Sequence, residues 1–146
     1  MKGVRWHYIL ILVLSIMLSA SILIFFPKLS EPETIPPPGE LLIPWDVAGD
    51  HAGTVKIVEG PVVDAIFKNW AIGKPTLLYI GKPYPDPDRF SVLIWSDHRG
   101  RFAEKFPPDP ETHLLNKTVK VRGVIDKSKG SPEIALIDPA NIWISE

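Results

Sequence analysis

Hydrophobic and polar positions alternate along a long segment that begins near residue 54. In TVKIVEGPVVDAIF, Val55 and Ile57 alternate with polar neighbours, and the pattern shifts at Gly60 and Pro61. Alternation with a period of two is typical of a half-buried strand, and a glycine followed by a proline inside it indicates a bulge or a bend. The pattern therefore predicts a long strand that bends midway, as a strand must when a small sheet curls around its own core.

Shorter apolar runs follow at residues 76–80 (TLLYI), 90–95 (FSVLIW), 117–125 (KTVKVRGVI), 133–137 (EIALI) and 141–144 (NIWI). The first two runs are joined by a loop that is rich in proline, which cannot donate to a strand ladder. In this loop, we expect Asp86 and Asp88 to accept hydrogen bonds from nearby amides. A short helix is expected at Arg101–Phe106, because Pro107 would end it there.

The order of these elements predicts the fold. Three strands, a short helix and two more strands follow one another in a five-stranded OB-fold barrel. We therefore expect an all-β domain with one short helix. A piece of an open sandwich is the alternative that the periodicity leaves open.

The N-terminal segment has a different pattern. Tyr8–Phe26 is a run of 19 residues without a charge, about 28 Å long as a helix, which matches the hydrocarbon core of a bilayer. Lys2 and Arg5 precede it, so the positive-inside rule places residues 1–7 in the cytoplasm and the rest of the chain outside. A cleaved signal peptide is the alternative, but cleavage at one of its serines would leave an apolar terminus. The sequence predicts a single transmembrane helix at residues 8–26 that anchors the chain in the cell membrane.

A proline-rich segment separates this helix from the folded part. Residues 27–45 include Pro36, Pro37 and Pro38, which favour an extended spacer. We expect the folded domain at residues 46–146, where 13 basic and 14 acidic side chains give no bulk attraction to nucleic acid. The chain has no cysteine, which excludes disulfides and thiolate metal sites.

Several longer runs of the domain carry a family resemblance. These are VEGPVVDA, GKPTLLYIGKPYPDPDRFSVLIW, FPPDPETHLLNKTVKVRGVI and GSPEIALIDPANI, which together extend from about Asp50 to Ile144. They resemble a family of prokaryotic OB-fold domains classed as nucleic-acid-binding-like, which occur as accessory domains of micrococcal-type nucleases and as stand-alone anchored proteins. The resemblance implies the fold and supplies no catalytic residue.

The second and third predicted strands offer a candidate binding surface. If one set of alternating positions forms the core (Leu78, Ile80, Phe90, Val92 and Ile94), the other set lines an outer face (Leu77, Tyr79, Ser91, Leu93 and Trp95). This face and its two flanking loops bind ligands in OB-folds, and aromatic rings beside lysines suit base stacking and phosphate contact. The predicted ligand-binding residues are Lys68, Trp70, Lys74, Tyr79, Trp95, Lys127 and Lys129.

Catalytic and metal-binding patterns are weak by comparison. Ser96, Asp97 and His98 are adjacent in the chain, and adjacency does not produce the spatial relay of a hydrolase triad. Asp86, Asp88 and Asp97 lack the spacing of a calcium loop. The D-G-D-T type segment of micrococcal nucleases and the H-x-x-x-Y segment of haem chaperones are absent. We therefore expect a chain that is not an enzyme and holds no metal or cofactor.

Three uses of the outer face stay open at this point. The first is a membrane-anchored, extracytoplasmic module for single-stranded nucleic acid, which the family resemblance favours. The second is a contact with another envelope protein through the same face, which the near-neutral charge of the domain allows. The third is plain structural packing.

Overall fold

The structure is a computed structural model that describes residues 41–127 and 129–145. They belong to the unit Pro36–Glu146, the second of two into which the chain divides. Within the part of the chain that the structure describes, no helix is long and apolar enough to cross a membrane. The transmembrane helix predicted at residues 8–26 lies outside the described residues.

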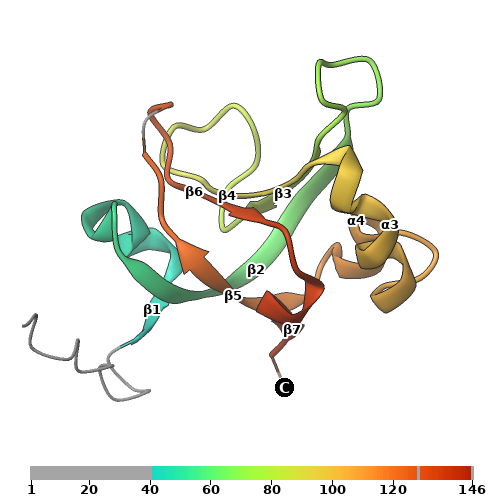
Figure 1. Cartoon of the computed structure of the whole chain (residues 1–146). Helices are drawn as coiled ribbons and strands as arrows, with labels where there is room; N and C mark the ends of the chain where they lie inside the picture. Colours follow the sequence, from blue (N-terminus) through green and yellow to red (C-terminus); the bar gives the residue numbers. More distant parts are fainter. Residues whose placement is uncertain (1–40, 128, 146) are drawn as a thin grey trace, which may run out of the picture. The chain divides into compact units, whose positions relative to one another are not determined.

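The described domain is mostly β (Figure 1). Its mixed, open sheet has the strand order β6-β4-β3-β2-β5-β7, and β1 pairs with β2 beside this path. The strands are β1 (Leu42–Pro44), β2 (Val55–Phe67), β3 (Thr76–Ile80), β4 (Phe90–Ile94), β5 (Thr118–Val124), β6 (Glu133–Leu136) and β7 (Ile142–Ile144). All five predicted strands are present, as β2 to β6, and the apolar segment near the C-terminus adds β7.

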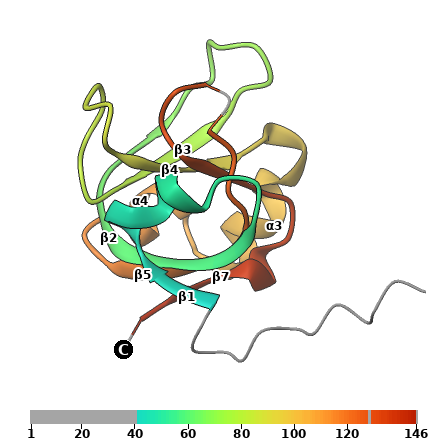
Figure 2. The ribbon, with the colours of Figure 1, turned by 90° about the vertical axis from the view of Figure 1, so that its left-hand side faces the viewer.

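The long strand predicted near residue 54 is β2, and it bends as predicted. The first half of β2 pairs with β5 up to Pro61, and its second half pairs with β3 from Val62. The register shifts between Val62 and Asp64, slightly after the Gly-Pro pair. Gly60 has a packing role, because a Cβ there would lie 2.5 Å from the side chain of Ile80. Figure 2 shows the resulting curvature of β2.

The curled sheet brings β6, at one end, back to the residues that follow β5. β4 and β6 pair in parallel, with Ser91 opposite Glu133. An isolated antiparallel bridge between Asp126 and Glu133 then joins the chain just after β5 to the start of β6. Glu133 is therefore held by backbone pairing on both sides.

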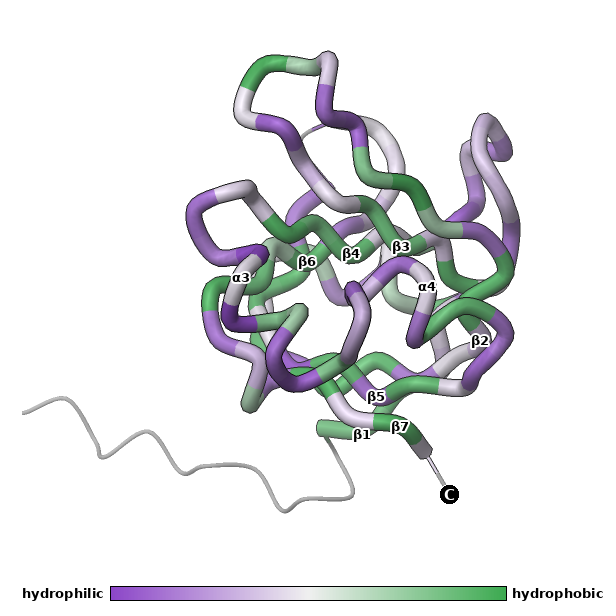
Figure 3. The backbone as a smooth tube through the Cα atoms, turned by 90° about the vertical axis from the view of Figure 1, so that its right-hand side faces the viewer, coloured by the Kyte–Doolittle hydropathy of each residue, from purple (hydrophilic) through white to green (hydrophobic). Residues whose placement is uncertain are grey.

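The core lies inside this curled sheet. Leu78 and Ile80 of β3 and Phe90, Val92 and Ile94 of β4 are fully buried, which confirms the predicted inward set. Hydrophobic segments run along these two strands in Figure 3. Phe102 and Leu114, from the two helices, complete the same cluster.

The helical region differs from the prediction of one helix at Arg101–Phe106. Helix α3 spans Ser96–Lys105 and begins directly after Trp95, and a second helix, α4, spans Pro110–Leu114. Pro107 does follow the end of α3, as expected. The second helix has an Asp N-cap and a proline in its first turn, two start signals that the hydrophobic pattern does not reveal.

The sheet also begins earlier than the predicted domain boundary at Asp46. β1 pairs in parallel with β2, with Ile43 opposite Val58, and Ile43 is buried in the core. A 3-10 helix, η1 (Trp45–His51), follows immediately. Residues 42–44 therefore form a strand of the described sheet, and Ile43 contributes its side chain to the core.

Candidate functional site

Two tyrosine rings meet on the outer face of β3. Tyr79 lies on that face, as predicted, but only 3% of it is exposed. The Tyr84 ring, from the β3–β4 loop, lies beside it with a centroid separation of 6.0 Å and an interplanar angle of 34°. This separation is within the range of attractive aromatic pairs. Tyr84, which is 59% exposed, therefore presents the accessible ring of the pair.

Two cations flank these rings. The guanidinium carbon of Arg89 lies 5.6 Å from the Tyr79 ring centroid and 5.1 Å from the Tyr84 ring centroid, and Lys68 Nζ lies 5.3 Å from the Tyr84 ring centroid. Such distances are typical of cation–π contacts. Burial raises the pKa of the Tyr79 hydroxyl, while the charge of Arg89 opposes this rise. Tyr79 is thus neutral at physiological pH.

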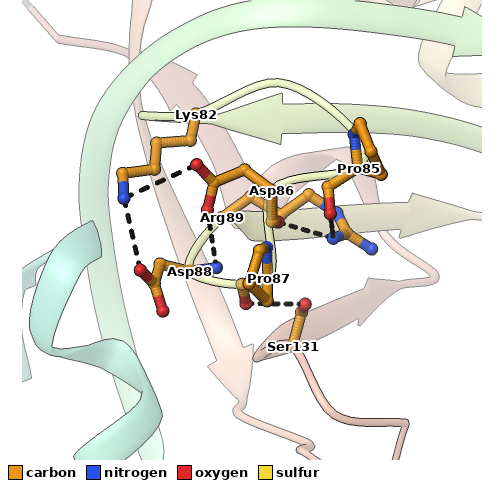
Figure 4. Close-up of polar contacts among 7 residues, drawn as sticks. All are labelled: Lys82, Pro85, Asp86, Pro87, Asp88, Arg89 and Ser131. Atoms are coloured by element: carbon orange, nitrogen blue, oxygen red, sulfur yellow. Dashed lines mark hydrogen bonds and ion pairs between the residues drawn. The ribbon is translucent and has the colours of Figure 1, made fainter.

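The β3–β4 loop that carries Tyr84 is tied down by polar contacts (Figure 4). Asp86 Oδ1 accepts from the Asp88 amide at 2.9 Å, which confirms the predicted role of Asp86. The Asp88 carboxylate instead accepts from Lys82 Nζ at 3.3 Å. Ser131 Oγ, from the β5–β6 loop, donates to the Pro87 carbonyl at 2.8 Å. The two loops are therefore fastened to each other beside the tyrosine pair.

Arg89 is held by the same loop. Its Nη1 donates to the Asp86 carbonyl at 2.7 Å and contacts the Pro85 carbonyl at 3.4 Å. Because backbone carbonyls are neutral, these bonds orient the guanidinium without cancelling its charge. Arg89 can therefore still attract an anion at the tyrosine pair.

A hollow of about 140 Å³ opens beside the two rings. We call it the tyrosine hollow; it is lined by Lys68, Leu77, Tyr79, Tyr84, Arg89, Ser91, Lys129, Ser131 and Glu133. Its lining carries three cations and one carboxylate, although the whole chain has a net charge of −1. The face is thus locally positive, which suits an anionic ligand.

A second hollow of about 280 Å³ continues the same face toward β2. It shares Lys68, Tyr79 and Tyr84 with the tyrosine hollow and adds the strand residues 64–66. The Tyr84 ring therefore lines both hollows. A chain-like ligand that runs across β2, β3 and β4 would meet this ring midway.

Three of the predicted residues gather elsewhere, at the β2–β3 loop. This loop projects from the body of the domain (Figures 1 and 2). Trp70 is 72% exposed in it, and Lys74 adopts a positive φ of 42°. Trp95 packs against the loop, because a Cβ at Gly73 would lie only 2.6 Å from its ring. These residues lie outside the tyrosine hollow.

Lys127 is separated from the other predicted lysines. It lines a different hollow, of about 610 Å³, between η1 and the loops β3–β4 and β5–β6. We call this the Trp45 hollow; it is lined by Trp45, Asp46, Gly49, Asp50, Lys82, Pro87, Asp88, Lys127, Gly130 and Pro132. With three carboxylates and two lysines, it is not a positive surface. Of the predicted set, only Lys68, Tyr79 and Lys129 share the tyrosine hollow.

Sequence reasoning missed four residues of this site. Tyr84 and Arg89 lie in or beside the proline-rich loop, for which only the acceptor roles of Asp86 and Asp88 were predicted. Ser131 and Glu133 flank the start of β6. The available signal was the spacing of Tyr84 and Arg89, which lie on either side of Pro85 and Pro87, two prolines that restrict the loop.

The described residues hold no group of three or more His, Asp or Glu side chains placed to bind a metal ion. Asp86 and Asp88 are engaged in the loop contacts described above.

The comparisons with known proteins give distant likenesses only. No family model and no curated protein matches the chain. Among solved structures, a putative aspartyl-tRNA synthetase from Leishmania major Friedlin matches 82% of this chain and 23% of its own, at 11% identity and a TM-score of 0.43. The aspartyl-tRNA synthetase from Entamoeba histolytica matches 82% of this chain and 24% of its own, at 14% identity and a TM-score of 0.39.

A third structure, the OBody AM1L10 bound to hen egg-white lysozyme, matches 66% of this chain and 84% of its own, at 20% identity and a TM-score of 0.43. This chain spans about a quarter of the length of the two synthetases. Likenesses of this strength assign no function, and the family predicted from the sequence stays a prediction.

Proposed function

We propose that this chain is an OB-fold binding module for single-stranded nucleic acid. The arrangement of the tyrosine hollow carries the proposal: an accessible aromatic ring, Tyr84, with Arg89 and Lys68 against it, on a face that is positive in a near-neutral protein. Stacking of bases on aromatic rings and attraction of the backbone to nearby cations are the two contributions that such ligands require.

The position of the hollow supports the same function. β2, β3 and β4 form a meander, β4 and β6 are parallel, and helices connect β4 to β5. On an OB-fold reading, β3 and β4 are the second and third barrel strands, and ligands bind on their outer face between the first and fourth connecting loops. Lys68 comes from the first of these loops, and Lys129 and Ser131 come from the fourth.

The proposal includes the setting of the module. It is non-catalytic and is attached by the apolar segment at residues 8–26, with the N-terminus in the cytoplasm and the domain outside the cell membrane. The uncharged run and the basic residues before it support this orientation. Protease protection of a C-terminally tagged chain in intact cells tests it, because a protected tag would place the domain inside.

Binding is tested by fluorescence anisotropy with the full-length chain in neutral detergent micelles. The probe is a labelled strand of about 15 deoxythymidines, long enough for one OB-fold site. We expect saturable binding that weakens as salt is raised, because phosphate contacts release counterions. Absence of binding at low salt would reject the proposed function.

Tyr84 supplies the matched variants for this test. Tyr84→Ala removes the exposed ring and should weaken binding about 5- to 100-fold, the usual contribution of one stacked base. Tyr84→Phe keeps the ring and should bind nearly as well as the unmodified chain. Equal affinities of the Ala and Phe variants would mean that the ring is not a stacking platform.

Contact with another envelope protein, through the same face and the β2–β3 loop that flanks it, is the second candidate function. The tip of the β2–β3 loop favours it, since Ile72 is 99% exposed and Trp70 is 72% exposed. Exposed apolar side chains of this kind are typical of protein contacts. Crosslinking from the position of Ile72 in cells would give one discrete adduct in this case, and would give none if the face binds nucleic acid alone.

A further inference from the structure

Two hydrogen-bond acceptors lie near each other in the lining of the tyrosine hollow. Glu133 is its only carboxylate, and 16% of that side chain is exposed. The Ser131 hydroxyl, next to it in the lining, uses its proton in the hydrogen bond to the Pro87 carbonyl. A carboxylate accepts only, and a hydroxyl whose proton is engaged can only accept further bonds. Both groups therefore present acceptors to whatever enters the hollow.

These acceptors are held in place. The backbone of Glu133 pairs with Asp126 through bonds of 2.7 and 2.8 Å and lies opposite Ser91 in the β4–β6 ladder. Lys129 Nζ donates to Glu133 Oε1 at 3.2 Å, which fixes the orientation of the carboxylate. The edge therefore keeps its acceptor character when a ligand arrives.

The hollow has room for one six-membered ring, the ring of a base that carries its Watson–Crick edge. A cavity of about 150 Å³ is known to accommodate benzene, and the tyrosine hollow measures about 140 Å³ and is open to solvent beside Tyr84. A base stacked against the tyrosine pair would therefore turn one edge toward Glu133 and Ser131. That edge must carry donors, because two acceptors facing each other would leave both without a bond.

We propose that Glu133 makes the module selective for guanine over thymine or uracil. Guanine presents two neighbouring donors, N1–H and the N2 amino group, and a carboxylate can accept both. Thymine and uracil present one donor between two carbonyl acceptors, so they can give the acceptors of this edge only one hydrogen bond. Carboxylates are known to accept from the amino groups of bases, and single-stranded bases are read on their Watson–Crick edges. This inference rests on the proposed function.

The experiment compares two labelled strands on the full-length chain in detergent micelles. One is the strand of about 15 deoxythymidines, and the other carries a single guanine at its centre. We expect the guanine strand to bind at least about fivefold more tightly, the lower end of what a bidentate base contact contributes. A third strand, with inosine in place of guanine, lacks the N2 amino group and should lose most of this preference.

Glu133→Gln tests the assigned residue. The amide replaces one acceptor by a donor, so the ratio of the two affinities should fall to about one. Asp64→Asn is the matched control, because it removes a carboxylate from the neighbouring hollow on the same face. It should strengthen binding of both strands equally and leave their ratio unchanged. Ser131→Ala gives a second test at the same edge, with a partial loss of the preference.

The outcomes separate the two proposals. If neither strand binds, the proposed function itself fails. If both bind with equal affinity, the module binds nucleic acid and the inference about Glu133 is overturned. If Glu133→Gln keeps the full preference for guanine, another group reads the base, and the assignment to Glu133 is wrong.

Discussion

The ring of Trp45 lies directly against the backbone of Gly81. A Cβ at Gly81 would come within 2.1 Å of Trp45 Cε2, and Gly81 also has a positive φ of 77°. Trp45 follows β1, and Gly81 follows β3, so this contact joins the start of the domain to the middle of the sheet. It explains why the described sheet includes residues ahead of the predicted boundary.

Gly81→Ala should therefore be strongly destabilising. The substitution adds a left-handed alanine, which costs about 1–2 kcal/mol, and a steric clash, which costs about 1–3 kcal/mol more. Gly53→Ala is the matched control, because Gly53 has a similar φ of 83° with nothing within 4 Å of the added Cβ. Urea unfolding of both variants isolates the clash. Equal losses would show that Trp45 moves aside freely.

Arg99 links both helices to the sheet. Its Nη2 donates to Glu111 Oε1 of α4, its Nε donates to Thr76 Oγ1 of β3 at 3.2 Å, and its guanidinium lies 4.1 Å from the Phe67 ring centroid. The side chains of Arg99 and Glu111 are only 23% and 16% exposed, so the pair is partly desolvated. Removing one partner leaves the other charge without its counterpart.

We expect Arg99→Met and Glu111→Gln to be coupled. Each single variant should lose stability, and the double variant should lose less than the sum, with a coupling free energy of about 1 kcal/mol or more. Chemical unfolding of the four chains measures it. Additive losses would indicate that the pair contributes only through packing.

Asp109 caps α4 and should make stability depend on acid pH. Its Oδ1 accepts from the Thr112 amide at 2.7 Å. Partial burial raises the pKa of Asp109, but the bonds from Thr112 outweigh it and hold the pKa below the ordinary 3.8. A lowered folded pKa means that the carboxylate stabilises the fold above pH 3.8, and that this contribution disappears as pH falls through the folded pKa.

The substitutions at this cap separate its charge from its hydrogen bond. Asp109→Ala should cost about 1 kcal/mol at neutral pH, the usual value for an N-cap. Asp109→Asn keeps an acceptor and should cost less stability. The difference in unfolding temperature between this variant and the unmodified chain should narrow below pH 3.8. Thermal unfolding from pH 3 to pH 7 measures this. A gap that stays constant over that range would assign no role to the charge.

Periodicity alone predicted the strands and their inward faces. Val92 and Ile94 alternate with outward positions, and a buried set with a period of two leaves little freedom in register. Periodicity could not reveal β1 and α4, because each element is too short to show a period. Their positions depend on the contacts of Ile43 and on the cap of Asp109, which are tertiary and local effects.

The candidate site was predicted only in part. Strand alternation placed Tyr79 on the outer face, and the loop order placed Lys68 and Lys129 near it. How the proline-rich loop folds back decides where Tyr84 and Arg89 lie, and no periodicity encodes that. The separation of Lys127 from Lys129, only two residues apart, likewise follows from a turn, in which the Gly130 amide donates to the Lys127 carbonyl at 3.0 Å.

This separation of the lysines gives a further prediction for binding. Lys68 and Lys129 line the positive tyrosine hollow, whereas Lys127 lines the Trp45 hollow among carboxylates. Lys68→Ala and Lys129→Ala should each weaken binding of single-stranded DNA and reduce the slope of log K against log salt by about 0.7, the value for one phosphate contact. Lys127→Ala removes the same charge and should leave that slope unchanged.

Lys127→Ala is an informative control because all three variants change the net charge of the chain by the same amount. Each loses one positive charge from a chain of net charge −1, so a purely global electrostatic attraction would weaken all three alike. Anisotropy titrations at four or five salt concentrations supply the slopes. Equal slopes for Lys68→Ala and Lys127→Ala would locate the ligand away from the tyrosine hollow, whereas a loss confined to Lys68 and Lys129 would place the phosphates along the outer face of β3 and β4.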